Sequence, residues 1–486
     1  MSYQQKPLMS RRTALAQAAG AAGLGAIFKM TEGRAAAQAR GGAAGQAAGA
    51  PRGGGRGNVP YGAINKYSSP SDLRITDLQS VAIAGRYDYD IIRMDTNQGV
   101  YGLGEGNGIL KAVADVREFV VGRNPLDITA ILTELRLRTA HAEMRDAMSV
   151  LDMCLHDLVG KVFGVPAWRL LGDKKRGQIR IYCDTTGSND PKVYAARLLE
   201  RKKMGFTFFK MDIGTGLIRN KPGAVNDHGA ATNKGLQYYG ELIQAVRDTI
   251  GWDVPIAADH FGGLDVSDAI RHARSFEPYD LAWAEDILQV GTLDRGPEPK
   301  NWRAYKQIQD ATSTRLATGE ANFGLEERFK DFIDNRAISV VHLDPQNCGG
   351  MREIKRIGDY ANQTQGIPIA THMLGSPVMA FAAVHALATI DQFLAMEHHA
   401  VMSLPWWNTI VTGVSQPVVD KGYITVPDSP GLGIELNEPV VKQQLRLPGW
   451  FQSLTPANAP PRGNVESAAY PHFDSEGKWV ITNADR

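Results

Sequence analysis

From Ile179 onward the sequence alternates between short apolar segments and longer amphipathic ones, and this alternation restricts the fold more than any other feature. The apolar segments read as strands, and the segments between them read as helices. The predicted strands span residues 179–183, 206–211, 255–259, 281–285, 315–319, 338–343, 367–371 and 393–396. Strict alternation of this kind produces parallel sheets, and eight such units favour a closed barrel over an open sheet. The sequence therefore predicts an α/β fold built on a TIM-like (β/α) barrel.

Charged residues recur at the C-terminal ends of these predicted strands. They are Lys210, Asp212, Asp259, Glu285, Glu320, Asp344, His372 and Glu397. A βα barrel presents its chemistry at this end of its strands. Asp344 and His372 end adjacent strands, so the carboxylate can orient the imidazole and raise its basicity. For any one residue, an ordinary polar strand end explains the observation equally well. The repetition along the chain favours a functional site.

Three of these carboxylates, Asp259, Glu285 and Glu320, end three consecutive predicted strands. Buried like charges this close together raise one another's pKa or destabilise the fold. A divalent cation resolves the conflict, and an all-oxygen ligand set favours Mg²⁺ over zinc. A salt bridge to a neighbouring loop would explain a single such carboxylate, but it explains three in series less well.

The residues before the barrel follow a different order. Three predicted strands, within residues 73–105, precede helices predicted at about 109–121, 127–138 and 143–162. Strands followed by helices predict a small α+β capping domain. After residue 402 the alternation ends, and we expect the tail to return and cover the first domain. The predicted boundaries are 71–178 for the cap, 179–402 for the barrel and 403–486 for the C-terminal segment.

The N-terminal residues read as an export signal. An arginine pair, Arg11-Arg12, precedes a weakly apolar run and then the small residues Ala35-Ala36-Ala37. This order predicts a twin-arginine signal peptide over 1–37, followed by a flexible Gly/Ala-rich linker over 38–70, and a periplasmic or exported protein. The alternative is a disordered Ala/Gly tail that contains two arginines. The apolar run is too short and too rich in Ala and Gly for a membrane span.

Net charge and cysteine content restrict the classes of binding partner and metal site that we expect. The formal net charge of +1 gives no reason to expect nucleic acid or an anionic membrane surface. The three cysteines, Cys154, Cys183 and Cys348, are far apart and match no metal-ligand spacing. We expect them to be buried free thiols.

From about Leu73 to Asn437 the sequence resembles the enolase superfamily, in its mandelate racemase/muconate lactonizing enzyme-like group. The resemblance is carried by the carboxylate triad and by residues 96–105, 151–161 and 428–435. It implies a modified (β/α)7β barrel, a cap completed by the C-terminal tail, Mg²⁺ as cofactor, a small carboxylate substrate such as a sugar acid, and a homo-oligomer.

The resemblance also implies roles for individual residues. His372 takes the proton next to the substrate carboxylate, Asp344 orients His372, and Lys210 lies beside that carboxylate. Glu397 hydrogen-bonds the enolate oxygen. A Lys or His base with Mg²⁺ stabilising an ene-diolate is known of this superfamily. Such stabilisation is required because imidazole alone is far too weak a base for this C–H bond.

Two positions depart from the racemase pattern. Asp212 stands where racemases have a second lysine, and moving a proton between faces requires an acid or base on each face. Loss of a β-hydroxyl requires one base, so the sequence predicts an acid-sugar dehydratase that makes a 2-keto-3-deoxy acid from an aldonate or aldarate. His260 follows a metal ligand, where an acid role and a packing role are both open. Asp212 and His260 are candidate substrate-binding residues.

Two alternatives remain open at this point. One is an epimerase, racemase or cycloisomerase of the same superfamily. The other is an exported sugar-acid binding protein whose catalysis has degenerated.

Overall fold

The computed structural model describes residues 69–85, 89–138, 142–288, 302–398, 404, 406–460, 471–473 and 479–481. All of them belong to one compact unit, Gly57–Arg486. The predicted signal peptide and nearly all of the predicted linker lie outside the described residues, so both stay predictions. Within the described ranges, no helix combines the length and the apolarity that crossing a bilayer requires.

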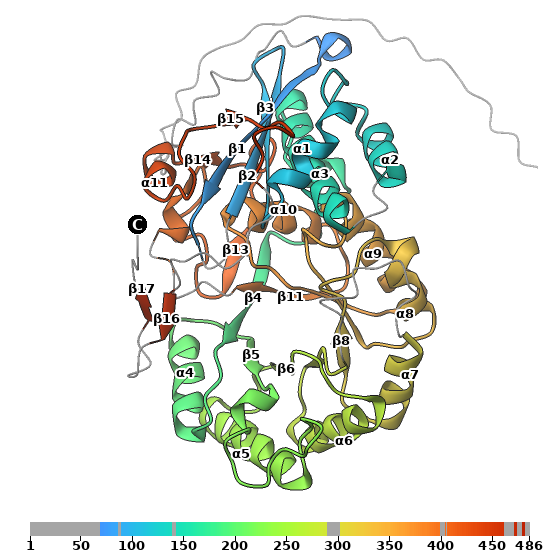
Figure 1. Ribbon diagram of the computed structural model, residues 1–486, viewed down its shortest axis with the longest axis vertical. Coiled ribbons are helices and arrows are strands. Elements are labelled where there is room, and N and C mark those ends of the chain that lie inside the picture. The colour runs from blue at the N-terminus through green and yellow to red at the C-terminus, as the bar shows by residue number, and fades with distance from the viewer. Residues whose placement is uncertain are drawn as a thin grey trace, which may run out of the picture. The chain divides into compact units, whose positions relative to one another are not determined.

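The cap is an antiparallel sheet packed on helices (Figure 1). Its strands are β1 (Ile75–Ile83), β2 (Tyr89–Thr96) and β3 (Tyr101–Gly106), and its helices are α1 (Leu110–Val116), α2 (Ile128–Arg138) and α3 (Ala142–Phe163). Helix α3 lies so close to β3 that a Cβ on Gly102 would stand 2.0 Å from the Cys154 carbonyl oxygen. The predicted order of strands and then helices is confirmed.

The barrel is closed and parallel, as predicted. Its strands are β4 (Gln178–Thr185), β5 (Phe209–Asp212), β6 (Ile256–Asp259), β7 (Ala284–Glu285), β8 (Leu316–Thr318), β9 (Val340–Leu343), β10 (Ile369–Thr371) and β11 (Phe393–His398). Each pairs in parallel with the next, and β11 pairs with β4 to close the ring. Two strands are shorter at their N-terminal ends than predicted. Strand β7 spans two residues, where 281–285 was predicted, and β5 begins at Phe209, where 206–211 was predicted.

Helices connect these strands on the outside of the barrel (Figure 1). They are α4 (Pro191–Lys203), α5 (Asn233–Ile250), α6 (Val266–Phe276), α7 (Trp302–Ala311), α8 (Lys330–Asp334), α9 (Gly350–Gln365) and α10 (Pro377–Leu387). In the described part of the chain α10 is the last of them, and β11 is followed by the tail. This is the (β/α)7β arrangement.

The barrel interior begins with an apolar layer of eight side chains, each from a barrel strand or from the residue directly before it. Its members are Tyr182, Phe208, Ala257, Trp283, Ala317, Val340, Ala370 and Ala395, which form one buried cluster. Three aromatic rings dominate it, and the Phe208 and Trp283 ring centroids are 5.1 Å apart. Inward-pointing side chains stack in such layers because alternate residues of a strand face the same side.

Two residues further along each strand lies a second layer of very different composition. It consists of Asp184, Lys210, Asp259, Glu285, Gly319, His342, His372 and Glu397. Because the strands are all parallel, the next inward-facing residues lie toward the C-terminal end of the barrel, and the ladders pair Asp184 with Lys210 and Asp259 with Glu285. The alternation that builds the apolar layer therefore also gathers the charged residues. We refer to these eight residues as the charged layer.

The tail returns to the cap, as expected, and it also pairs with the barrel. Strand β13 (Tyr423–Thr425) pairs with β4, and β15 (Gln452–Ser453) pairs with β1 of the cap. The remaining elements are β12 (Val411–Thr412), β14 (Glu435–Leu436), α11 (Glu438–Gln443), β16 (Pro471–Phe473) and β17 (Trp479–Ile481). Trp407 is buried and donates from Nε1 to the Gly375 carbonyl oxygen at 3.2 Å.

All three cysteines are buried and free, as predicted. Burial raises the pKa of Cys154 and Cys348 well above its ordinary value, and raises that of Cys183 to about 12. A thiol reacts as its thiolate, so these groups are chemically quiet at neutral pH.

Candidate functional site

Lys210 is the centre of the charged layer. Its ammonium Nζ lies 2.7 Å from Glu397 Oε1, 3.0 Å from Glu285 Oε1 and 3.3 Å from Asp259 Oδ2. All four side chains are almost fully buried. One cation therefore serves three carboxylates that come from three different strands, and the cluster retains an excess of negative charge.

The electrostatics of the cluster reflect that excess. Burial, followed by the neighbouring Glu285, raises the pKa of Asp259 to about 8. Burial also raises the pKa of Glu285, although Lys210 opposes the change. Carboxylates that are forced together without enough positive charge favour protonation or the binding of a cation. The layer thus has the electrostatic character of a metal site.

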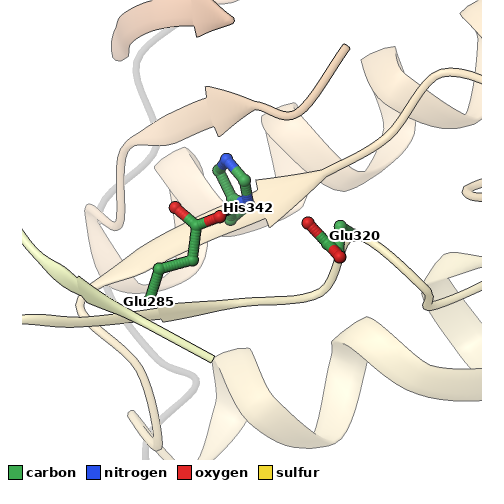
Figure 2. A group of neighbouring side chains, drawn as sticks. All are labelled: Glu285, Glu320 and His342. Carbon is green, nitrogen blue, oxygen red and sulfur yellow. Dashed lines mark ion pairs between the residues drawn. The ribbon is translucent and has the colours of Figure 1, made fainter. Parts of the chain in front are cut away.

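The ligand atoms are suitably placed for such an ion. Glu285, Glu320 and His342 each offer one atom, and these atoms all lie within 4.8 Å of one another. Figure 2 shows the three side chains around one space, with Glu285 on β7, Glu320 after β8 and His342 on β9. Asp259 adjoins this group through Lys210, which contacts both Asp259 and Glu285. The predominance of carboxylate oxygens fits a hard divalent cation.

His372 and Asp344 form a dyad beside this cluster. The His372 Nδ1–H donates to Asp344 Oδ2 at 2.8 Å, which leaves Nε2 directed toward Glu320 Oε2 at 3.6 Å and Glu397 Oε2 at 3.8 Å. Burial lowers the pKa of His372, but Glu320, Glu397 and Asp344 oppose it more strongly and raise the pKa well above its usual range. The imidazole is therefore oriented by Asp344, and its Nε2 faces the carboxylates of Glu320 and Glu397.

Exposure shows from which side a small molecule can approach. The side chain of Glu320 is 32% exposed and that of His372 is 11% exposed, whereas Lys210, Glu285 and Glu397 are exposed by 2% or less. A ligand entering the barrel mouth therefore meets Glu320 and Nε2 of His372 first.

Glu397 contacts several parts of this arrangement. Besides the ion pair with Lys210, its Oε2 accepts from the backbone N–H of Met373, the residue after His372, at 3.3 Å. The carboxyl thus lies between Lys210 and His372.

Asp212 lies at the mouth, half-buried, two residues beyond Lys210 on β5. Burial raises the pKa of Asp212 well above its ordinary value, and the Asp184 carboxyl to which it is hydrogen-bonded raises it further. On the strands β4 and β5, a pair of carboxyl groups therefore occupies the position of a second lysine base.

His260 is not brought into the group. It follows Asp259 on the opposite face of the strand and packs on His272 of α6, with ring centroids 4.5 Å apart. Its Nδ1 lies 2.9 Å from the Gly262 carbonyl oxygen. Burial lowers the pKa of His260 to about 4. Of the two roles left open by the sequence, the observed contacts match packing.

Two members of the charged layer, Asp184 and His342, are not among the residues predicted from the sequence, although the sequence contains a signal for both. Counting two residues onward from Tyr182 and from Val340 reaches Asp184 and His342. Each of them lies inside its own strand and not after the strand's last residue, so neither belongs to the pattern of charged strand ends.

Both parts of the chain, the cap and the barrel, resemble known proteins. Residues 76–172 match the family model of the mandelate racemase / muconate lactonizing enzyme N-terminal domain, and residues 193–440 match that of the enolase C-terminal domain-like family. The D-xylonate dehydratase of Haloferax volcanii is 30% identical over 387 residues, which cover 77% of this chain and 89% of that protein.

Further relatives have similar coverage. A D-galactonate dehydratase family member from Musicola paradisiaca is 26% identical over 425 residues, which cover 79% of this chain and 98% of the relative. The solved structure of a mandelate racemase/muconate lactonizing enzyme-like protein from Rubrobacter xylanophilus matches with a TM-score of 0.70 at 28% identity. That match covers 80% of this chain and 99% of the other.

Proposed function

The chain belongs to the mandelate racemase / muconate lactonizing enzyme group of the enolase superfamily, and on that premise we propose that it is a Mg²⁺-dependent acid-sugar dehydratase. The reaction removes the proton on the carbon next to the substrate carboxylate and then expels the hydroxyl on the following carbon as water. The resulting enol tautomerises to a 2-keto-3-deoxy acid. The printed names of the relatives, a D-xylonate dehydratase and a D-galactonate dehydratase family member, support a sugar acid as substrate.

The observation that carries the proposal is the His372–Asp344 dyad at the barrel mouth. Asp344 fixes the imidazole through Nδ1, so that Nε2 is the atom left to accept a proton. The same nitrogen can then return that proton to the leaving hydroxide, since one histidine can act first as base and then as acid on one face of the substrate.

The carbon acid must be stabilised for so weak a base to react. A divalent cation bound by Asp259, Glu285 and Glu320 would supply Lewis-acid stabilisation of the substrate carboxylate. Lys210 adds a fixed positive charge beside it, and Glu397 can hydrogen-bond the enolate oxygen when it is protonated. Both groups are held by buried contacts before the substrate arrives, so little reorganisation accompanies the reaction.

The opposite face of the site supports elimination over racemisation. Asp184 and Asp212 stand on β4 and β5, where a racemase would need a lysine able to exchange a proton with the second face. With one base, the fate of the carbanion is reprotonation on the original face or loss of the β-hydroxyl.

A panel of aldonates and aldarates with Mg²⁺, assayed for keto-acid product, tests the proposal. We expect at least one substrate to yield product, and we expect His372→Asn to reduce turnover by about 10²–10⁴-fold. His228→Asn, at an exposed loop histidine, serves as a matched control and should retain wild-type turnover. Solvent deuterium entering recovered substrate without keto acid would indicate an epimerase. Ligand binding without any exchange would indicate a binding protein.

A further inference from the structure

His342 is a fully buried member of the charged layer with two polar neighbours. Its Nε2 lies 2.9 Å from the Tyr182 hydroxyl, in the apolar layer below. Its Nδ1 lies 3.6 Å from Glu285 Oε1 and has no hydrogen-bond partner among the described residues. The ring thus stands between a tyrosine and a carboxylate assigned to the metal, without a role in the mechanism above.

The possible proton arrangements restrict what this histidine does. A neutral imidazole has one N–H and one lone pair. If Tyr182 donates to Nε2, the proton is on Nδ1 and faces an acceptor, Glu285. If Tyr182 accepts instead, a nitrogen lone pair faces a carboxylate oxygen, which is unfavourable without a cation between them. Burial raises the pKa of Tyr182 well above its ordinary value, so its hydroxyl keeps its proton.

The remaining contacts of Glu285 show how an N–H donor from His342 would help to hold this carboxylate. The indole Nε1–H of Trp283 donates to Oε2 at 2.8 Å, and Lys210 donates to Oε1 at 3.0 Å. An Nδ1–H from His342 approaches Oε1 from another strand, so the carboxylate would be held by donors from three strands. A carboxylate ligand fixed in this way is oriented before the metal binds.

We propose that Tyr182 and His342 act as a buried hydrogen-bonded pair that positions Glu285 for the divalent cation. This inference rests on the proposed function, because it concerns the same metal. His342 is in this view a positioning residue, which acts through Glu285 without contacting the substrate. Loss of groups that support a metal ligand in this manner typically weakens metal binding by about 10–100-fold.

Direct titration with Mn²⁺, followed by its electron paramagnetic resonance signal, tests the inference without any assay of activity. His342→Leu removes both ring nitrogens, and we expect it to raise the Mn²⁺ Kd by about 10–100-fold. His342→Asn keeps a donor near the position of Nδ1 and should recover most of that loss. Tyr182→Phe removes one hydroxyl and should weaken binding in the same direction, which keeps the test available if His342→Leu fails to fold.

His385→Leu is the matched control, because His385 is also fully buried but lies on α10, where it contacts Trp168 and Leu432. It should lower thermal stability and leave the Mn²⁺ Kd unchanged. A wild-type Kd in both His342→Leu and Tyr182→Phe would overturn the inference while leaving the proposed function standing. Equal loss of binding in His342→Leu and His342→Asn, with Tyr182→Phe unaffected, would also overturn it and make His342 a direct ligand. Absence of Mn²⁺ binding by the wild-type protein would overturn both proposals.

Discussion

The apolar layer and the charged layer of the barrel come from the same eight strands, two residues apart, yet they obey opposite physical rules. In the apolar layer every side chain is buried, and three aromatic rings fill most of the space. In the charged layer Lys210 contacts Asp259 and Glu285, and the pKa values of these two carboxylates are raised by burial and by neighbouring carboxylates. The first layer stabilises the fold, whereas the second holds charges that the folded chain by itself does not balance.

The comparison teaches where the stability of the site comes from. Repulsion within the charged layer must be offset by packing elsewhere, and the nearest such packing is the apolar layer directly below it. Active sites commonly have such a destabilising arrangement, which is retained for function. Substitutions in the two layers should therefore change different properties of the protein.

The largest expected effect is on stability, from a substitution in the apolar layer. Phe208→Ala leaves a cavity beside Tyr182 and Trp283, and we expect the free energy of unfolding to fall by about 3–5 kcal/mol. Urea denaturation at fixed pH measures it. Phe163→Ala, at a 54% exposed ring, is the matched control and should change stability far less. Equal losses in the two variants would show that this layer does not carry the stability we assign to it.

A smaller effect on stability is expected when a divalent cation supplies the positive charge that the charged layer lacks. Mg²⁺ at about 100 times its Kd should raise the free energy of unfolding by about 2.7 kcal/mol, because it binds the folded state selectively. Glu320→Gln should remove most of this gain, whereas Glu241→Gln, on the exposed face of α5, should keep it. Thermal unfolding with and without Mg²⁺ gives the comparison. An identical gain in wild type and Glu320→Gln would place the ion elsewhere.

The strands that form the two layers could be predicted from the sequence, but the contacts within the charged layer could not. All eight barrel strands were predictable, because an apolar run that ends in a charge is a local pattern. The role of Lys210 as a shared partner was not, since its contacts with Asp259, Glu285 and Glu397 depend on how the closed barrel brings distant strands together. Roles assigned to individual site residues by resemblance stay predictions until the variants are measured.

Contacts between the cap and the barrel were the hardest to predict. Glu105 on β3 accepts from the backbone N–H of Ser376 at 2.6 Å and from that of Met379 at 3.1 Å, at the N-terminus of α10. The Ser376 hydroxyl donates to the same carboxylate. These residues are 271 positions or more apart, and no local periodicity connects them. The contact matters because residues 373–376 directly follow His372.

Glu105 extends the comparison to a buried carboxylate that the fold itself satisfies. Burial raises the pKa of Glu105 from 4.5 to about 7, although its hydrogen bonds oppose the change. The folded state then binds a proton more tightly than the unfolded state between these values, so stability falls as pH rises from about 4.5 to 7. A shift of this size corresponds to about 3 kcal/mol, and the opposing hydrogen bonds from Ser376 and Met379 at the N-terminus of α10 are already part of it.

The smallest predicted effect is therefore a loss of about 2 kcal/mol that can be assigned to Glu105, because the range from pH 5 to pH 8 covers most of the shift. We expect the stability of the wild type relative to Glu105→Gln to fall by this amount between pH 5 and pH 8, measured by urea unfolding at several pH values. A relative stability that rises with pH would mean that the α10 N-terminus and the three donors outweigh burial. Glu105 would then be a carboxylate fully balanced by the fold, in direct contrast to Asp259 and Glu285, which would still require a cation.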